Sequence, residues 1–174
     1  EIFRGEPTDV SAGGSFYYDK DEKYAMFYRM ATFNDIEYYY WFEGDKDLTK
    51  VKWIASSCRI QTFKKKVLIM PKQVWSFGGK IYKAGSLLSC DFGSFVKVGE
   101  LKALFLGAGA HNVGEEPKCD IQILYEPAND RCAYEGATDS RDYLYVSSLE
   151  NLQSKITVYR FDDATNAFIL EGAH

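Results

Sequence analysis

The chain has 174 residues, of which 46% are hydrophobic and 16% aromatic, and its formal net charge at pH 7 is −4. The hydrophobic content excludes a disordered chain, and the length is typical of one domain, which we expect to span residues 1–174. A pI near 5.3 and dispersed lysines and arginines argue against nucleic-acid binding, and no apolar stretch approaches the ~20 residues that span a bilayer.

Alternating apolar and polar side chains predict antiparallel strands in the first part of the chain. A short strand at 15–18 is followed by a charged turn, a strand at 23–32, a loop at 33–35 and a strand at 36–43. Because successive strand residues point to opposite faces, these two longer strands each present one inward face. The residues predicted to point inward are Tyr24, Met26, Tyr28, Met30, Ile36, Tyr38, Tyr40 and Phe42.

Shorter strands are predicted along the rest of the chain at intervals of about ten residues. They cover 58–63, 67–70, 74–77, 80–83, 87–90, 95–98, 101–106, 121–125, 143–146 and 156–161. Gly78-Gly79 suits a hairpin turn, residues 107–117 are predicted to be a loop, and residues 148–154 are predicted to form one short helix. This spacing predicts an all-β sandwich or barrel of one domain.

The cysteine pattern favours a disulfide-stapled secreted fold. Cys58, Cys90, Cys119 and Cys132 are even in number and include no Cys-x-x-Cys pair, and with only two histidines no zinc site is expected. We expect two disulfides among them, with all three pairings open, and four buried free thiols are the alternative. The start at Glu1, without a methionine, fits a secreted protein whose leader has been removed.

Groups suited to catalysis are scarce. His111 lies in a glycine-rich segment that lacks the following helix that a phosphate-binding loop needs, and the other histidine is His174. Acidic pairs fall in predicted turns, where calcium is an open alternative to simple solvation, but no specific ligand spacing is present. We therefore expect no catalytic residues, no defined metal site and no enzymatic activity.

Large aromatic rings on neighbouring strands are the most informative feature. Rings and methionines in bulk are difficult to close-pack, and tyrosine hydroxyls need partners when buried, so a cleft for an apolar ligand satisfies both conditions. The residues predicted to bind that ligand are Tyr24, Met26, Tyr28, Tyr38, Tyr40, Phe42, Trp53 and Trp75.

Several short segments, taken in order, resemble the ependymin-related proteins, which are secreted β proteins of animals. These segments are Phe3-Arg4-Gly5, Tyr17-Tyr18-Asp19, Ser57-Cys58-Arg59, Tyr82-Lys83-Ala84-Gly85-Ser86, Asp130-Arg131-Cys132 and the strand at 143–149. The resemblance implies two stacked antiparallel sheets curved around a hydrophobic pocket, often in a homo- or heterodimer with a related chain. It also implies binding of lipids, calcium association in some members, and carotenoid binding in some marine invertebrate relatives. The cysteines differ from the family's, so its disulfide pattern does not transfer.

The sequence thus predicts a secreted carrier of a hydrophobic small molecule, with a carotenoid as the first candidate and a fatty acid or other lipid as the second. An alternative from another class is an extracellular carbohydrate-binding or adhesion module. In that case the outward rings of Tyr39 and Trp41 would be the platform on which sugars stack. These two rings also suggest an interface with a second chain, since aromatic residues are enriched in interface cores.

Overall fold

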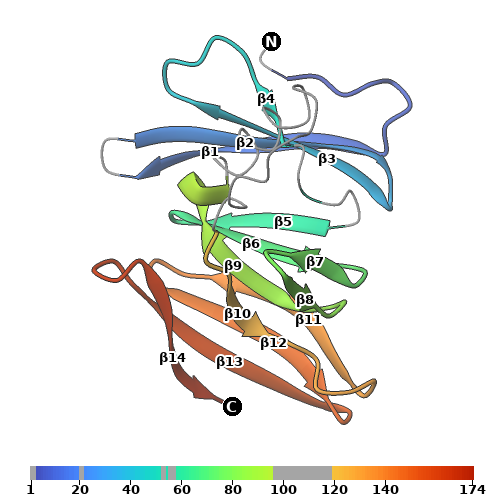
Figure 1. The fold of residues 1–174 in the computed structure, drawn as a ribbon, viewed down its shortest axis with the longest axis vertical. Coiled ribbons are helices and arrows are strands. Elements are labelled where there is room, and N and C mark those ends of the chain that lie inside the picture. The colour runs from blue at the N-terminus through green and yellow to red at the C-terminus, as the bar shows by residue number, and fades with distance from the viewer. Residues whose placement is uncertain (1–2, 20–21, 52–53, 55–57, 96–118) are drawn as a thin grey trace.

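The fold is nearly all β and antiparallel, as predicted. The computed structural model describes residues 3–19, 22–51, 54, 58–95 and 119–174 (Figure 1). The described strands form three four-stranded sheets and one two-stranded hairpin, rather than the two sheets expected. The expected strand at 101–106 and the loop at 107–117 lie outside the described residues.

Each four-stranded sheet is built from strands that follow one another along the chain. The first sheet contains β1 (Ser11–Asp19), β2 (Glu22–Thr32), β3 (Asp35–Phe42) and β4 (Thr49–Lys50). The second contains β5 (Cys58–Phe63), β6 (Lys66–Pro71), β9 (Leu87–Asp91) and β10 (Gln122–Tyr125), with the hairpin of β7 (Trp75–Phe77) and β8 (Lys80–Tyr82) inserted between β6 and β9. The third contains β11 (Cys132–Asp139), β12 (Tyr143–Glu150), β13 (Gln153–Asp162) and β14 (Ala167–Ala173).

The three sheets lie as successive layers, with the second between the first and the third (Figure 1). One hydrophobic cluster joins the first and second sheets, and another joins the second and third. This repeated order, in which each four-stranded sheet packs on the next, is the one found in the blades of β-propellers.

The middle sheet is buried on both faces, which explains the nearly continuous apolar sequence of β6. Val67 and Ile69 belong to the cluster shared with the first sheet, whereas Leu68 belongs to the cluster shared with the third. All three side chains are fully buried.

The turn between β5 and β6 ties the middle sheet to both neighbours. Lys64 has a left-handed backbone (φ 48°), and its carbonyl accepts a hydrogen bond from the hydroxyl of Tyr24 in the first sheet. On the other side, Nζ of Lys64 lies 2.8 Å from a carboxylate oxygen of Asp142 and 4.9 Å from the ring centre of Phe161. One short turn therefore contacts all three layers.

Two turns with left-handed backbone geometry connect neighbouring strands into hairpins. Gly78 and Gly79 both have left-handed φ values and connect β7 to β8, so the predicted hairpin is confirmed. The short helix predicted over 148–154 is wrong: Asn151 and Leu152, at φ 52° and 69°, form a two-residue turn between β12 and β13. Left-handed backbone at both positions is the geometry of a tight hairpin turn, and it is incompatible with a right-handed helix.

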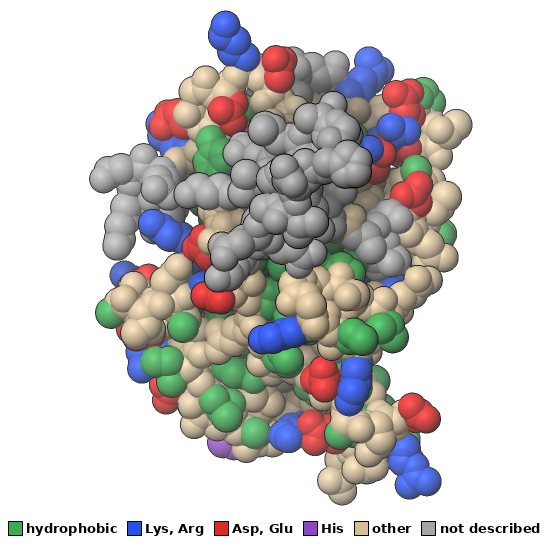
Figure 2. All heavy atoms as spheres, in the orientation of Figure 1, with side chains coloured by type: hydrophobic (Ala, Val, Ile, Leu, Met, Phe, Trp, Pro, Cys, Tyr) green, Lys and Arg blue, Asp and Glu red, His purple; other side chains and the backbone are tan. Residues whose placement is uncertain are grey.

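Charged side chains of both signs are spread over one face of the molecule (Figure 2). On the face shown in Figure 2, positive and negative side chains alternate across the described part of the surface. In the part of the chain that the structure describes, no helix is long and apolar enough to cross a membrane.

Candidate functional site

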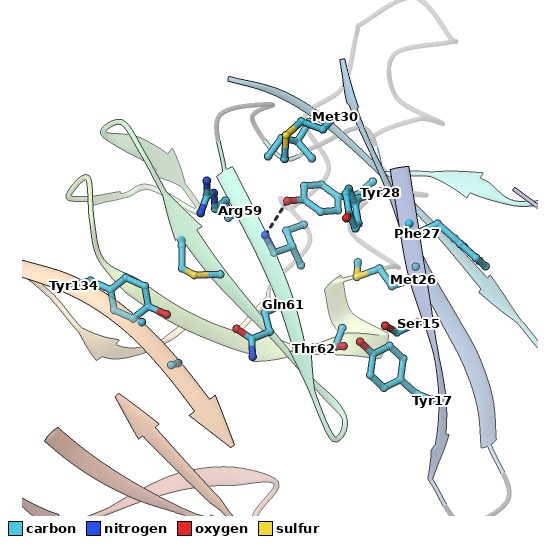
Figure 3. Close-up of a pocket in the computed structure, with 18 of the residues that line it drawn as sticks. Ser15, Tyr17, Met26, Phe27, Tyr28, Met30, Arg59, Gln61, Thr62 and Tyr134 are labelled. Carbon is cyan, nitrogen blue, oxygen red and sulfur yellow. Dashed lines mark hydrogen bonds between the residues drawn. The ribbon is translucent and has the colours of Figure 1, made fainter. Parts of the chain in front are cut away.

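A cavity of about 900 Å³ lies where the first strands of the three sheets come together (Figure 3). β1, β5 and β11 each form one edge of their own sheet, and residues from all three strands line this cavity. The cavity is therefore bordered by strand edges, where backbone groups that are not used within the sheet remain.

The walls of the cavity are mixed in character. The apolar part comes mainly from the first sheet, through Met26, Met30 and Ile36. Arg59 and Glu135 are the charged side chains among the lining residues, and Arg59 is exposed. The other polar side chains of the lining are those of Ser15, Tyr17, Tyr28, Tyr38, Gln61, Thr62 and Tyr134. A site of this kind accepts a molecule with both polar and apolar parts.

The structure divides the residues that we predicted to bind a ligand into two groups. Met26, Tyr28 and Tyr38 line the cavity. The others that the structure describes pack in the cluster between the first two sheets, and Trp53 lies outside the described residues. The packed residues are Tyr24, Tyr40, Phe42 and Trp75. Most of the inward rings thus fill a core between sheets.

The hydroxyl of Tyr38 links the first sheet to the free edge of β5. It accepts a hydrogen bond of 2.9 Å from the backbone N–H of Ile60 and donates one of 3.3 Å to the carbonyl of Cys58. Burial raises the pKa of Tyr38 to about 12, because the phenolate would lose its hydration. The hydroxyl therefore stays protonated and can keep both bonds at neutral pH.

A close approach between β1 and β2 requires glycine at position 14. A Cβ atom there would lie 2.2 Å from Cδ1 of Phe27 and 2.9 Å from the carbonyl oxygen of Met26. We expect Gly14→Ala to lower the free energy of unfolding by about 1–3 kcal/mol, because the ring and the backbone must both shift. Urea unfolding followed by circular dichroism measures this change.

Gly136 is the matched control for Gly14. It also lines the cavity, and it lies in β11, the first strand of the third sheet. A Cβ atom added there meets no atom within 4 Å. Gly136→Ala is therefore expected to change the free energy of unfolding by no more than about 0.5 kcal/mol. Equal losses in both variants would contradict the steric explanation.

Neither histidine of the chain is found among the described residues that line the cavity. His111 lies outside the described residues, and His174 follows the last strand. In the described part of the chain, no group of three or more His, Cys, Asp or Glu side chains gathers in a way that could hold a metal ion. All four cysteines are free thiols, so the two predicted disulfides are absent.

Two known proteins are similar to this chain over most of its length. It is 26% identical over 166 residues to an uncharacterized peptidase, y4nA, of Sinorhizobium fredii, in an alignment that covers 92% of this chain and 20% of that protein. The fold matches the structure of a post-proline cleaving enzyme from Rickettsia typhi with a TM-score of 0.69 and 16% identity, covering 95% of this chain and 22% of the other. The chain thus spans about a fifth of each protein. No family model matches it.

These matches overturn the functional expectations drawn from the sequence. Both similar proteins are named as peptide-cleaving enzymes, which contradicts the ependymin-related assignment, the lipid or carotenoid carrier, the carbohydrate-binding alternative and the absence of enzymatic activity. The resemblance was carried by short aromatic and glycine-containing segments, which antiparallel sheets of many kinds require for packing and turns. A scarcity of histidine also carries little weight when the chain aligns with only about a fifth of each similar protein.

Proposed function

We propose that this chain is part of a peptidase, in which its stacked sheets form a non-catalytic wall that contacts the peptide substrate. The observation that carries the proposal is the 26% identity to a peptidase over 92% of the chain. The shared fold with a post-proline cleaving enzyme supports it and suggests a finer expectation, namely that the substrates contain proline.

The cavity supports a role in contacting peptides. An extended peptide presents apolar side chains together with unpaired backbone N–H and C=O groups. The lining offers partners for both, in Met26 and Met30 on one wall and the edge strands β1, β5 and β11 around it. The side chains of Arg59 and Glu135 add one group of each charge. The lining residues that the structure describes include no histidine, and we propose that the groups that cleave the peptide lie elsewhere in the peptidase.

The outer faces of the stack support a larger assembly of sheets. The far face of the first sheet carries a layer of rings in which Phe16 and Phe27 lie 5.7 Å apart, and Phe16 is 49% exposed. On the far face of the third sheet, Tyr143, Ile156 and Ile169 are 37%, 46% and 38% exposed. Propellers contain about four to eight such sheets, each of which covers the face of the next. We propose that further sheets of the peptidase pack on these two faces.

Peptide binding to the 174-residue chain tests the proposal. We expect fluorescence anisotropy to detect binding of a labelled, extended peptide with one central proline, and weaker binding of the same peptide with alanine in its place. Absence of binding by either peptide would contradict the role of the cavity. Cleavage after proline by this chain alone, detected by mass spectrometry, would contradict its assignment as a non-catalytic wall.

A variant that fills the cavity locates the binding site. Gly136→Trp introduces a large side chain on a wall of the cavity where an added Cβ atom meets no neighbour. We expect this variant to raise the Kd for the peptide at least about tenfold, which corresponds to about 1.4 kcal/mol of binding free energy. Ile81→Trp is the control, because Ile81 is 73% exposed on the β7–β8 hairpin and is not part of the lining. Equal affinities in the two variants would place the peptide elsewhere.

A further inference from the structure

Arg59 lies on the wall of the cavity without a charged partner. Two other arginines lie in described strands, and both are paired. Nε of Arg29 is 2.7 Å from a carboxylate oxygen of Asp9, and Nε of Arg160 is 2.7 Å from one of Glu171. Within the described part of the chain, the guanidinium of Arg59 forms no ion pair or hydrogen bond. It keeps five N–H donors and a fixed positive charge, so it offers a binding group for an anion.

The alternation of β5 determines the direction in which Arg59 points. Successive strand residues face opposite sides, and Phe63 packs in the cluster between the second and third sheets. Arg59 and Gln61 therefore share the face of β5 that is turned toward the third sheet. Figure 3 shows both side chains leaving β5 on the side of Tyr134. The guanidinium thus faces the part of the cavity that the second and third sheets border.

Neutral hydrogen-bonding groups and an apolar surface surround this part of the cavity. Among the described residues, neither Gln61 nor Tyr134 has a partner for its side-chain polar group. Burial raises the pKa of Tyr134, so its hydroxyl stays protonated and can donate a hydrogen bond. Met70, which is paired with Arg59 across β5 and β6, packs against the same cluster as Tyr134. A bound molecule here meets several donors beside an apolar surface.

The negative charge of the described lining lies on another sheet and already has a partner. Glu135 belongs to β11, and its carboxylate accepts a hydrogen bond of 3.1 Å from the hydroxyl of Ser147 in β12. Ser147 alternates with the buried Val146, which packs toward the middle sheet, so Ser147 faces the other way. Glu135 is therefore held toward the far face of the third sheet, and it does not neutralise Arg59.

We propose that Arg59 is a specificity-determining residue that binds a carboxylate of the peptide substrate. The inference rests on the proposed function, because it concerns the peptide that the cavity contacts. A carboxylate is planar and accepts two parallel N–H bonds from a guanidinium, and such charge-assisted bonds are stronger than those between neutral groups. Two groups of a peptide supply a carboxylate, namely the C-terminus and an acidic side chain. In both cases a neighbouring apolar side chain of the peptide can pack on Met70.

The exposure of Arg59 determines how strong and how salt-dependent this preference is. Solvent competes for an exposed guanidinium, so one carboxylate contributes less than it would at a buried site. We expect a preference of about tenfold for a carboxylate over a neutral group at low ionic strength. Salt screens exposed charges, so the preference is expected to shrink when sodium chloride is added.

Three N-terminally labelled peptides of one otherwise neutral sequence test the proposal. The first ends in a free carboxylate, the second in a carboxamide, and the third in a carboxamide preceded by a glutamate. In fluorescence anisotropy at low ionic strength, the neutral carboxamide is expected to have a Kd about tenfold higher than at least one of the two acids. The acid that binds more tightly identifies the source of the carboxylate.

The same titrations separate failure of this inference from failure of the proposed function. Equal Kd values for the three peptides would overturn the role of Arg59 and leave the contact between cavity and peptide intact. Absence of binding by all three peptides would overturn both.

Charge-matched variants locate the preference. Arg59→Gln is expected to remove the difference between the acids and the carboxamide, and to leave the Kd of the carboxamide within about twofold. Arg131→Gln is the control, because Arg131 is exposed, is not part of the lining, and carries the same charge. A preference that persists in Arg59→Gln would place the carboxylate elsewhere. A preference that is lost equally in Arg131→Gln would reflect net charge, and the proposal would be wrong.

Discussion

Shortening Ile69 to alanine is expected to lower the free energy of unfolding by about 2–5 kcal/mol. Ile69 lies in β6 of the middle sheet, is fully buried, and belongs to the cluster between the first and second sheets. The variant loses the transfer free energy of the removed carbons and leaves a cavity between two layers that are both held by other contacts. Because proteins of this size are stable by only about 5–15 kcal/mol, the loss is a large fraction of the total. Urea unfolding monitored by tryptophan fluorescence measures it.

The control for this variant is the same substitution on the surface. Ile81 lies in β8 and is 73% exposed, so Ile81→Ala is expected to change the free energy of unfolding by no more than about 0.5 kcal/mol. If Ile69→Ala were as harmless as Ile81→Ala, the packing of the first sheet on the second would not contribute to stability, and the layered description would be wrong.

Removing the hydroxyl of Tyr38 is expected to lower the free energy of unfolding by about 1–3 kcal/mol. Tyr38→Phe leaves the N–H of Ile60, at the free edge of β5, without the hydroxyl oxygen that accepts its hydrogen bond. Tyr28→Phe is the matched control, because Tyr28 pairs with Tyr38 across β2 and β3. The hydroxyl of Tyr28 forms a 3.2 Å hydrogen bond with that of Ser11, in a partly exposed position within the first sheet. A smaller loss in Tyr28→Phe distinguishes the bridge between sheets from a general effect of losing a phenol.

The same tyrosine makes stability depend on alkaline pH. The pKa of Tyr38 is about 12 in the folded chain, above its ordinary value of 10.0, chiefly because of burial. Between these values the unfolded chain loses the proton more readily, so stability is fully present below pH 10 and falls as the pH rises toward 12. At pH 11 the contribution lost is about 1.4 kcal/mol. Denaturant unfolding at pH 8 and 11 should show a smaller decrease in Tyr38→Phe than in the unmodified chain; equal decreases would exclude Tyr38 as the cause.

The sequence predicted local structure well where side chains alternate strictly. The inward residues of 23–32 and 36–43 pack between sheets as expected, because a one-residue change of register would turn every ring toward the other face. The prediction from sequence failed where strands are made of residues with low β propensity. β11 contains Ala, Glu, Gly and Asp, and its register shifts between Tyr134 and Gly136, so no simple alternation marks it.

The number of sheets and the cavity could not be read from the sequence. Alternating apolar and polar side chains indicate that a strand has an inner and an outer face. They do not indicate which sheet covers either face. The outer rings of Tyr39 and Trp41 show this, since they contact the rings of Phe3 and Phe16 at 5.3 and 6.4 Å instead of standing alone. The cavity depends on how the edges of three sheets converge, and its lining comes from segments more than one hundred residues apart.

The position of β6 between two hydrophobic clusters also determines how the molecule opens. In a stack where each layer contacts only its neighbours, an outer layer can separate by giving up one interface, whereas the middle layer must give up two. Backbone amides of β6 should therefore exchange their hydrogens with solvent only through the most complete unfolding events, while β1 and β14 exchange through smaller and more frequent openings. Subglobal fluctuations would thus begin at the two outer sheets, so that the strand edges bordering the cavity can move apart without loss of the central layer.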